Sequence, residues 1–236
     1  MNIHFSVDDC IKAFIELTEG KNTIKSIFET DTFSMAKLIH ELYGLPVSFY
    51  CMWTDGTTSL DKCTANYRSE FIANSDWLKF GFHCDTYETN YNDAFAGEAY
   101  NDYQKVISEV NRITGGYSIT DKIRLHYFSG NKEVIRALTK DCGVKTLLSA
   151  DDDRISYGLD ASDNEILKST GFFHDNETNC DFVRTDIRIE NIKDVSDELK
   201  KIDGRQEATI FTHEKYLSDD VYRERIMLLL KLVSMY

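Results

Sequence analysis

The feature that most constrains the fold is an alternation, along the whole chain, between short apolar runs and longer amphipathic patterns. The short runs are rich in Val, Ile, Phe and Tyr, which is typical of buried β-strands. When a strand, a helix and a second strand follow one another, the two strands run parallel and the helix packs on the sheet. The sequence therefore predicts a parallel α/β fold with strands at residues 3–7, 47–53, 78–83, 122–128, 144–150, 182–189 and 208–213.

Four amphipathic patterns between these runs predict helices. Each repeats apolar residues every three or four positions, and three of them end at a glycine, as helices commonly do. Asn131 stands where an N-cap is expected for a helix at 132–142. The apolar positions and their stops are Met35, Leu38, Ile39 and Leu42 with Gly44; Tyr103, Val106, Ile107, Val110 and Ile113 with Gly115 and Gly116; Val134, Ile135 and Leu138 with Gly143; and Val221, Ile226, Leu229, Leu230 and Val233.

The number of strands bears on the architecture. About seven strands favour an open or imperfect (β/α) barrel over a complete eight-stranded one. The chain holds one proline and 12 glycines, with no internal repeat, so no segment resembles a linker. We therefore expect a single domain that covers residues 1–236.

Composition excludes several classes of function. The chain has 27 basic and 40 acidic residues and a net charge of −13, which disfavours binding to nucleic acid. No apolar run approaches the roughly 18 residues of a membrane span. The amino terminus lacks the basic start and apolar stretch of a secretory signal, so we expect a cytoplasmic protein. The six cysteines form no C-x-x-C pair, which indicates reduced thiols rather than a zinc finger or an iron–sulfur site.

Titratable residues gather where the predicted strands end. The carboxyl ends of parallel strands meet at one edge of a sheet, where α/β folds carry their functional groups. Arg124 and His126 are two residues apart in a predicted strand, so we expect them on the same face. The residues at these ends are Asp8 and Asp9, His83 and Asp85, Arg124 and His126, Asp151 and Asp152, and His213 and Glu214.

Each of these residues alone also has a structural explanation. An Asp pair before a helix commonly caps it, a strand histidine is commonly a packed residue, and the acidic run at 151–153 can be a solvated loop. The other three histidines fall outside the pattern. We interpret His4 as structural, His40 as a residue of a helix surface and His174 as a loop residue.

Taken together, the residue types fit one kind of chemistry. Carboxylate and imidazole groups on converging strand ends are what a divalent metal that prefers oxygen and nitrogen requires. A second carboxylate could orient or deprotonate a water molecule, and a histidine on the opposite side could protonate a leaving group. An arginine beneath the site would hold one aspartate ionised.

In order and spacing, these residues resemble the polysaccharide deacetylase superfamily, also known as the NodB-homology proteins or carbohydrate esterase family 4. The resemblance spans nearly the whole chain and implies a distorted (β/α) barrel. The matching segments are SVDD at 6–9 for the family's T-F-D-D motif, PVSFY at 46–50 for its second strand, FGFHCDTY at 80–87 for H-[ST]-x-x-H, RLHYFSG at 124–130 for R-x-P-Y-G, and IFTH at 210–213 for L-x-H.

The resemblance implies a role for each matching residue. Asp8 would be the catalytic base, Asp9 and His83 metal ligands, Arg124 the residue that tethers Asp8, and His213 the general acid. The implied reaction is metal-assisted hydrolysis of an N-acetyl group on a sugar. Zinc is the expected cofactor, with nickel and cobalt as alternatives.

The sequence departs from the family pattern at two positions. Tyr87 stands where the second metal-binding histidine is expected, and His126 stands where the family has a proline. We hypothesise that His126 supplies the missing imidazole, because it is expected to share a strand face with Arg124. Asp85 and Tyr87 remain open as alternative third ligands.

Three classes of function follow. The first is a metal-dependent hydrolase that deacetylates an acetylated sugar or polysaccharide precursor, which in the cytoplasm would be nucleotide-linked, lipid-linked or a small molecule. The second is a catalytically lapsed relative that serves as a sugar-binding or assembly protein. The third is a metal-free glycoside hydrolase that uses a carboxylate pair such as Asp8 and Asp151. A carboxyl separation of about 5.5 Å, or of roughly 6.5–9.5 Å, would support that third reading.

Overall fold

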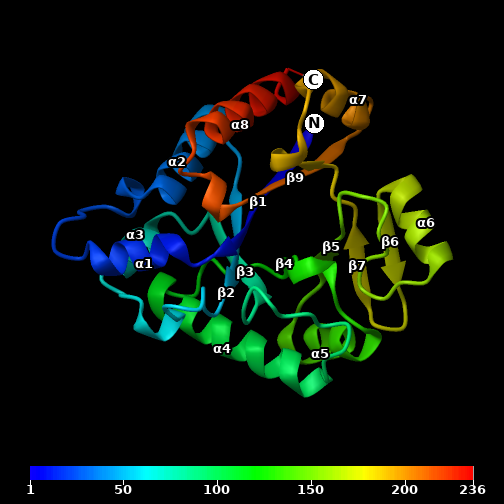
Figure 1. Ribbon diagram of the computed structural model, residues 1–236, viewed down its shortest axis with the longest axis horizontal. Coiled ribbons are helices and arrows are strands. Elements are labelled where there is room, and N and C mark those ends of the chain that lie inside the picture. The colour runs from blue at the N-terminus through cyan, green and yellow to red at the C-terminus, as the bar shows by residue number, and fades with distance from the viewer. Residues whose placement is uncertain (236) are drawn as a thin grey trace.

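The computed structural model describes residues 1–235, which form nine β-strands and eight α-helices (Figure 1). One sheet has five strands in the order β3-β2-β1-β9-β8, and every neighbouring pair in it is parallel. This parallel core confirms the predicted α/β fold. The strands of this sheet are β1 (Asn2–Cys10), β2 (Val47–Met52), β3 (Leu78–Cys84), β8 (Ile187–Arg188) and β9 (Glu207–His213).

The second sheet has four strands in the order β4-β5-β7-β6, of which only the edge strand β6 runs antiparallel to its neighbour. The two sheets adjoin beside β3, where the amide of Phe80 donates to the carbonyl of Ser118 and the amide of Thr120 donates to the carbonyl of Phe80, both at 2.9 Å. The strands of this sheet are β4 (Lys122–Ile123), β5 (Thr146–Leu148), β6 (Phe172–Asp175) and β7 (Cys180–Val183).

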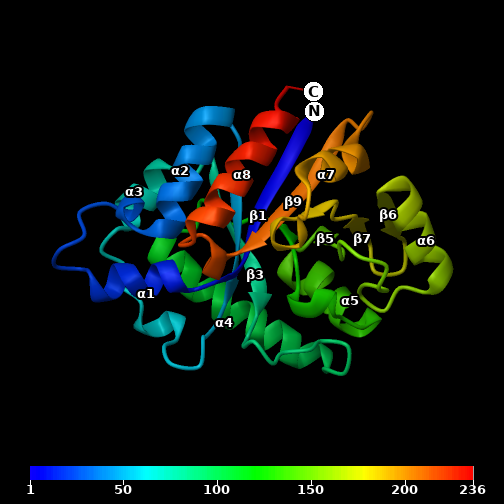
Figure 2. The same cartoon turned by 45° about the horizontal axis from the view of Figure 1, so that its top comes forward.

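Helices cover the outside of the sheets (Figures 1 and 2). Both views place α2 beside α8 on one side of the five-stranded sheet, and α4 beside α5 on the other. The helices are α1 (Lys12–Glu19), α2 (Asp31–Tyr43), α3 (Arg68–Ala73), α4 (Ala96–Thr114), α5 (Lys132–Cys142), α6 (Ala161–Thr170), α7 (Val195–Ile202) and α8 (Asp220–Val233).

The predicted helix boundaries agree with those of the structure where a glycine ends the helix. Gly44 and Gly143 lie in the left-handed region at φ +67° and +74° and end α2 and α5, a conformation that glycine adopts without strain. The Asn131 side chain accepts a hydrogen bond from the Val134 amide at the start of α5. One residue of the predicted apolar face of α8 is an exception, because Val221 is exposed.

The predicted strand at 122–128 is wrong beyond its first two residues. Strand β4 ends at Ile123, and His126–Phe128 form a 3-10 turn. Tyr127 and Phe128 have consecutive positive φ angles of 57° and 55°, which lie outside the region of a regular β-strand. The argument that Arg124 and His126 share a strand face therefore fails.

The predicted strand at 182–189 is also wrong, because it is two strands. Strand β7 belongs to the four-stranded sheet and β8 to the five-stranded sheet, so the chain changes sheets at residues 184–186. The reason lies in the backbone partners of this segment: the Arg184 amide donates to Gly171, whereas the Asp186 amide donates to Thr209. With β6, which the sequence did not predict, this split gives nine strands instead of about seven.

Two of the histidines set apart by the sequence differ from their predicted surroundings. His174 lies in β6 rather than in a loop, and its Nδ1 is 2.7 Å from Asp181 on β7. His40 is half-buried rather than on the helix surface, because its ring stacks on Trp77 with the centroids 4.4 Å apart. His4 is a packed strand residue, as expected, with its Nε2 3.0 Å from the Tyr50 hydroxyl.

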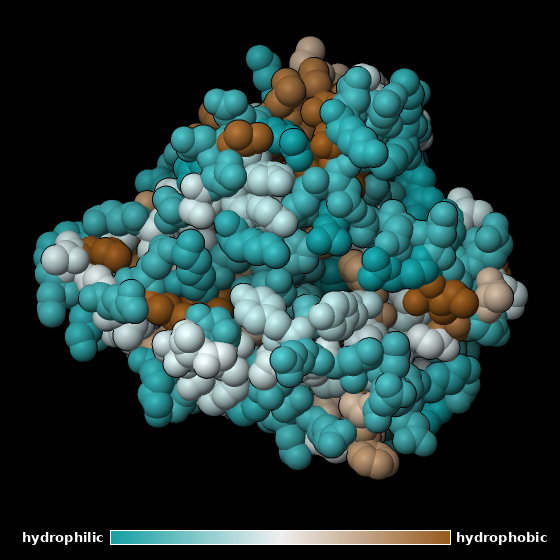
Figure 3. Space-filling model, in the orientation of Figure 1, coloured by the Kyte–Doolittle hydropathy of each residue, from teal (hydrophilic) through white to brown (hydrophobic). Residues whose placement is uncertain are grey.

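The interior is one hydrophobic cluster that draws on both sheets. At its centre, Phe14, Phe33, Phe71 and Phe80 pack with centroid separations between 5.3 and 6.3 Å. Five of the six cysteines are buried, and all six are free thiols. The face drawn in Figure 3 is mainly hydrophilic. None of the helices within residues 1–235 is long and apolar enough to span a membrane.

Candidate metal centre

Asp9 owes its orientation to a bulge in β1. Between the pairs Val7–Phe49 and Cys10–Cys51, β1 advances three residues while β2 advances two. Asp9 lies in this bulge with a φ of 59°, a left-handed conformation that aspartate tolerates better than most residues. The bulge interrupts the alternation of side chains along the strand and turns the Asp9 carboxylate toward β3.

His83, near the end of β3, is buried with 2% of its surface exposed. Its Nδ1 lies 2.6 Å from the carbonyl oxygen of Arg124. A carbonyl can only accept a hydrogen bond, so Nδ1 carries the proton and donates it. In the neutral ring, Nε2 then holds a lone pair, and this atom lies 3.2 Å from Oδ1 of Asp9.

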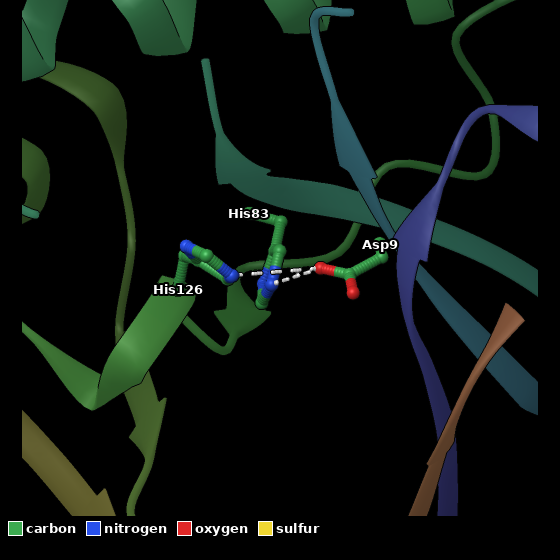
Figure 4. Close-up of side chains that lie close together, drawn as sticks. All are labelled: Asp9, His83 and His126. Atoms are coloured by element: carbon green, nitrogen blue, oxygen red, sulfur yellow. Dashed lines mark ion pairs between the residues drawn. The ribbon is translucent and has the colours of Figure 1, made fainter. Parts of the chain in front are cut away.

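His126 is oriented in the same way by a different backbone group. Its Nδ1 lies 3.3 Å from the carbonyl oxygen of Thr89, and its Nε2 lies 3.9 Å from Oδ1 of Asp9. The two imidazole rings meet edge to face with their centroids 5.3 Å apart. Figure 4 shows both rings pointing toward the Asp9 carboxylate.

These three residues fit a divalent cation. One ligand atom from each of Asp9, His83 and His126 lies within 4.8 Å of the other two. Oδ1 of Asp9 and Nε2 of His83 are buried and have no hydrogen-bond partner of normal geometry within residues 1–235. Lone pairs that face one another in a buried site are unfavourable unless a cation or a proton lies between them. Two nitrogens and one oxygen, with each histidine fixed by a carbonyl at its other nitrogen, form the donor set of many zinc sites.

Electrostatics couple the same three side chains. Burial alone would raise the pKa of Asp9, but the neighbouring histidines, above all His83, lower it to about 2. Burial would lower the pKa of His83, but the Asp9 carboxylate outweighs this effect and raises it. Burial, together with the charge of His83, lowers the pKa of His126. Asp9 is therefore the anion of the cluster, and His126 is the ring kept neutral most readily.

Asp8 is held from below by a buried arginine. Arg124 is fully buried, and its Nη1 donates to Oδ1 of Asp8 and to the hydroxyl of Ser6, both at 2.9 Å. Its Nη2 donates to the hydroxyl of Thr185 at 3.1 Å, and its guanidinium lies 4.1 Å from the centre of the Phe211 ring. The structure thus brings Arg124 and Asp8 into the contact that the sequence predicts.

His213 ends β9 directly beside Asp8, to which it is paired in register. Its Nδ1 lies 3.2 Å from Oε1 of Glu190, which also accepts from the His213 amide at 2.7 Å and from the Thr212 hydroxyl at 2.6 Å. Burial alone would raise the pKa of Glu190, but these contacts, above all with His213, lower it to about 2. Glu190 is thus an anion that accepts from Nδ1 of His213 and so fixes a proton on that nitrogen.

Glu190 is the residue of the candidate site that sequence reasoning missed. It directly follows the predicted strand at 182–189 and belongs to none of the motifs. Its position depends on the break between β7 and β8, which brings the short turn Ile189–Asn191 beside β9. No local pattern in the sequence marks this contact between residues 23 positions apart.

A cavity of about 250 Å³ is lined by Asp8, Arg124, His213 and both histidines of the cluster, but not by Asp9 or Glu190. Larger cavities exist, including one of about 530 Å³ beside Arg184 and Arg205, but the predicted site residues do not line it. Chemistry rather than size therefore identifies the candidate site. The residues that line it are Asp8, His83, Arg124, Leu125, His126, Tyr127, Phe128, Arg154, Arg188 and His213.

Neither alternative third ligand is placed as well as His126. The carboxylate of Asp85 forms an ion pair with Lys105 on α4. Burial and the charge of Asp9 raise the pKa of Tyr87 to about 12, which keeps its phenol neutral and a weak ligand. His126 therefore reaches the site, although through the 3-10 turn and not along a strand.

The remaining acidic candidates lie outside the cavity. Asp151 accepts a hydrogen bond from Asn191 at 3.1 Å and lines a different cavity, so it does not form a pair with Asp8 across this one. Asp152 forms an ion pair with Arg154. Glu214 is structural, because its carboxylate accepts from three backbone amides at the start of α1 and from the Thr32 hydroxyl.

No family model matches the sequence, and no curated protein matches it closely enough to count as a relative. Solved structures do match. A protein from Mycobacterium smegmatis assigned to the polysaccharide deacetylases superposes with a TM-score of 0.56 at 10% identity, over 97% of this chain and 83% of that one. The carbohydrate deacetylase Agd3 superposes with a TM-score of 0.55 at 10% identity, over 99% of this chain and 50% of that one.

The chain is also similar to BA3943 of Bacillus anthracis, a CE4-family pseudoenzyme, a mutant of which matches at a TM-score of 0.47 and 10% identity. This chain spans 63% of the length of that protein. At such identities, the likeness to the two structures with TM-scores above 0.5 establishes the fold. The predicted resemblance to the polysaccharide deacetylases is confirmed at that level.

Proposed function

We propose that this chain, whose fold is that of the polysaccharide deacetylases, is a metal-dependent amide hydrolase that removes an N-acetyl group from a carbohydrate. One observation carries the proposal. Asp8, Arg124, His213 and two of the three cluster residues, His83 and His126, line the same small cavity, and Asp9 contacts both of these histidines. A ligand set, a base and an acid are what hydrolysis of an unactivated amide requires.

A divalent cation held by Asp9, His83 and His126 would polarise the acetamide carbonyl and lower the pKa of water in the site. The oxygen- and nitrogen-based donor set suits zinc, nickel or cobalt. The two backbone carbonyls that accept from the Nδ1 atoms keep both rings turned toward Asp9 before any ligand arrives.

Asp8 is the residue that takes a proton from the attacking water. Arg124 engages only Oδ1 of Asp8, so the second carboxylate oxygen stays available as the acceptor. The buried guanidinium fixes the direction of the carboxylate through this hydrogen bond. Arg124 is therefore a positioning residue and does not itself touch the substrate.

His213 is the residue that gives a proton to the leaving nitrogen. Because Nδ1 faces Glu190, Nε2 is the atom free to donate. Water adds to the acetyl carbon, Asp8 accepts its proton, the carbon–nitrogen bond breaks, and Nε2 of His213 protonates the departing amine. The products are acetate and an amino sugar, and the anion of Glu190 stabilises the protonated ring before the transfer.

The first test is metal content, measured by plasma mass spectrometry on the purified protein. Asp9→Asn keeps a residue that tolerates positive φ, so it removes the ligand charge with little disturbance of the bulge. Asp85→Asn is the matched control, since Asp85 directly follows β3, the strand that carries His83, but pairs with Lys105. We expect about one ion per chain in the wild type and in Asp85→Asn, and none in Asp9→Asn.

The second test is acetate release from N-acetylglucosamine oligomers by the zinc-, nickel- or cobalt-loaded protein. Activity that a chelator removes and that metal restores would support the proposal. Equal metal content in the Asp9→Asn and wild-type proteins, or acetate release that persists without metal, would contradict it. Stoichiometric metal without acetate release from any acetylated sugar would point instead to a sugar-binding protein.

A further inference from the structure

Two arginines line the candidate cavity that neither the metal cluster nor the acid–base pairs require. Arg188, on β8, donates from Nε to Oε2 of Glu190 at 3.2 Å, and its guanidinium lies 5.6 Å from the centre of the Phe211 ring. Within residues 1–235 it forms no other side-chain hydrogen bond, so both terminal nitrogens remain available. The side chain is 27% exposed and lines the cavity, which places its forked donors where a ligand can reach them.

Arg154 approaches the cavity from the loop after β5. It holds Asp152 with Nε and Nη2, which leaves Nη1 without a partner among the described residues. Its guanidinium lies 5.5 Å from the centre of the Phe128 ring, and Phe128 packs edge to face against Phe211 with centroids 6.2 Å apart. The two arginines therefore each lie over one ring of the Phe128–Phe211 pair, of which Phe128 lines the cavity.

The positive charge of these arginines stands out against the rest of the molecule. The chain carries a net charge of −13, so its surface repels anions at long range. At the cavity, Asp8 pairs with Arg124, Asp9 contacts His83 and His126, and Glu190 contacts both His213 and Arg188. Arg154 pairs with Asp152, so each of the two arginines is held by one carboxylate and keeps at least one terminal nitrogen that no described residue engages.

On these observations, and on the premise of the proposed function, we propose that the substrate is an acetylated sugar that carries a carboxylate or a phosphate, and that Arg188 and Arg154 bind this anion. A guanidinium offers two parallel donors to a planar carboxylate or to a phosphate, and this pairing is stronger than a neutral hydrogen bond. Glu190 holds Arg188 by its inner nitrogen, so the outer edge is presented in advance of binding.

The position of Arg188 indicates which part of the substrate carries the charge. Arg188 and His213 both bind Glu190, so they lie on the same side of the cavity. His213 faces the leaving nitrogen, which belongs to the sugar and not to the acetyl group. The anion is therefore part of the sugar portion, and it remains on the amine product after acetate has left.

Binding affinity tests this proposal without reference to turnover. The probes are N-acetylglucosamine, N-acetylglucosamine 6-phosphate and N-acetylmuramic acid, titrated by calorimetry into the metal-loaded protein. The second probe carries a phosphate and the third a carboxylate, so the two arms distinguish the kinds of anion. We expect at least one anionic sugar to bind about ten- to a hundredfold more tightly than the neutral one, as for a lost charged hydrogen bond.

Substitutions test whether the two arginines cause the preference for anionic over neutral sugars. Arg188→Met and Arg154→Met should each reduce the preference for the anionic sugar, and the double variant should bind the anionic sugar no more tightly than the neutral one. Arg136→Met is the matched control, because Arg136 is an exposed arginine on α5 that pairs with Glu177 and does not line the cavity. The Arg136→Met variant should prefer anionic over neutral sugars to the same extent as the wild type.

Equal affinity for neutral and anionic sugars in the wild type would overturn the proposal. So would a preference that survives both Arg188→Met and Arg154→Met, since the anion would then bind elsewhere, for example at the metal. Acetate release from all three sugars is measured in parallel. Failure to release acetate from any of them would count against the proposed function, while the anion preference is judged from affinities alone.

Discussion

The Asp8–Arg124 pair permits a quantitative prediction, because both side chains are buried. Arg124 is fully buried, Asp8 is 2% exposed, and their ionic contact is 2.9 Å. Arg124→Met would leave the Asp8 carboxylate without its cation, and such a loss costs about 3–5 kcal/mol. That is a large part of the roughly 5–15 kcal/mol by which a protein of this kind is stable. Asp8→Asn would leave the guanidinium with only the hydroxyls of Ser6 and Thr185.

The double variant Asp8→Asn/Arg124→Met separates the pair from its surroundings. It removes both charges, so its free energy of unfolding should lie within about 1–2 kcal/mol of the wild-type value. Urea unfolding followed by circular dichroism gives all four free energies, and we expect a coupling energy of about 4 kcal/mol or more, because removing either partner alone costs about 3–5 kcal/mol while the double variant loses about 1–2 kcal/mol. Acetate release should fall by about 10²–10⁴-fold in both variants that lack the Asp8 carboxylate, although the double variant folds.

Two results would refute this reasoning. A cost below about 1 kcal/mol for Arg124→Met would mean that water reaches Asp8 and that the pair behaves as a surface contact. Full acetate release by the double variant would mean that Asp8 is not the base. The unfolding curves distinguish loss of structure from loss of chemistry, since only the single substitutions should shift the urea midpoint strongly.

Four further predictions concern the same site and its support. Zinc at a concentration of about one hundred times its Kd should raise the free energy of unfolding by about 2.7 kcal/mol. This gain, measured as a higher urea midpoint, should vanish in Asp9→Asn. His213→Ala should retain metal, by mass spectrometry, while acetate release falls by about 10²–10⁴-fold, and loss of metal would make His213 a ligand. Because the pKa of Glu190 is lowered from 4.5 to about 2, its contribution to stability is present above pH 4.5 and is lost as the pH falls toward 2. In Glu190→Gln, the free energy of unfolding should therefore fall less steeply between pH 4.5 and pH 2 than in the wild type. An unchanged slope would contradict the lowered pKa. Glu214→Ala should cost about 3 kcal/mol or more in urea unfolding, because three α1 amides and Thr32 lose their acceptor, and a cost below about 1 kcal/mol would mean that water replaces the carboxylate.

The parts of the fold that the sequence predicts are those set by local periodicity and by helix stops. The helix at 132–142 is a clear case, because its cap, its apolar stripe and its final glycine are all local signals. The strands of the five-stranded sheet that carry Asp8 and His213 were predicted for the same reason. Strand β6 was not, because it is only four residues long and its two phenylalanines belong to no longer apolar run.

The parts that escaped prediction depend on contacts between distant segments. The break between β7 and β8 depends on the amides of Arg184 and Asp186 finding partners in different sheets. The contact of Glu190 with His213 depends in turn on that break. No local sequence pattern marks either contact, because each joins residues from different segments of the chain.

His126 shows how a residue can be predicted by an argument whose geometry is wrong. The sequence placed it beside Arg124 on a strand, whereas the backbone leaves the strand after Ile123 and passes through positive φ angles at Tyr127 and Phe128. Side chains larger than glycine adopt this conformation at a cost of about 1–2 kcal/mol per residue. Asp9, on the opposite side of the cluster, also has a positive φ angle. Unfavourable backbone conformations thus coincide with the segments that carry two of the three proposed ligands. Because the packed surroundings must hold those conformations in place, the ligands are oriented before a cation binds, and less of the binding energy is used to order them.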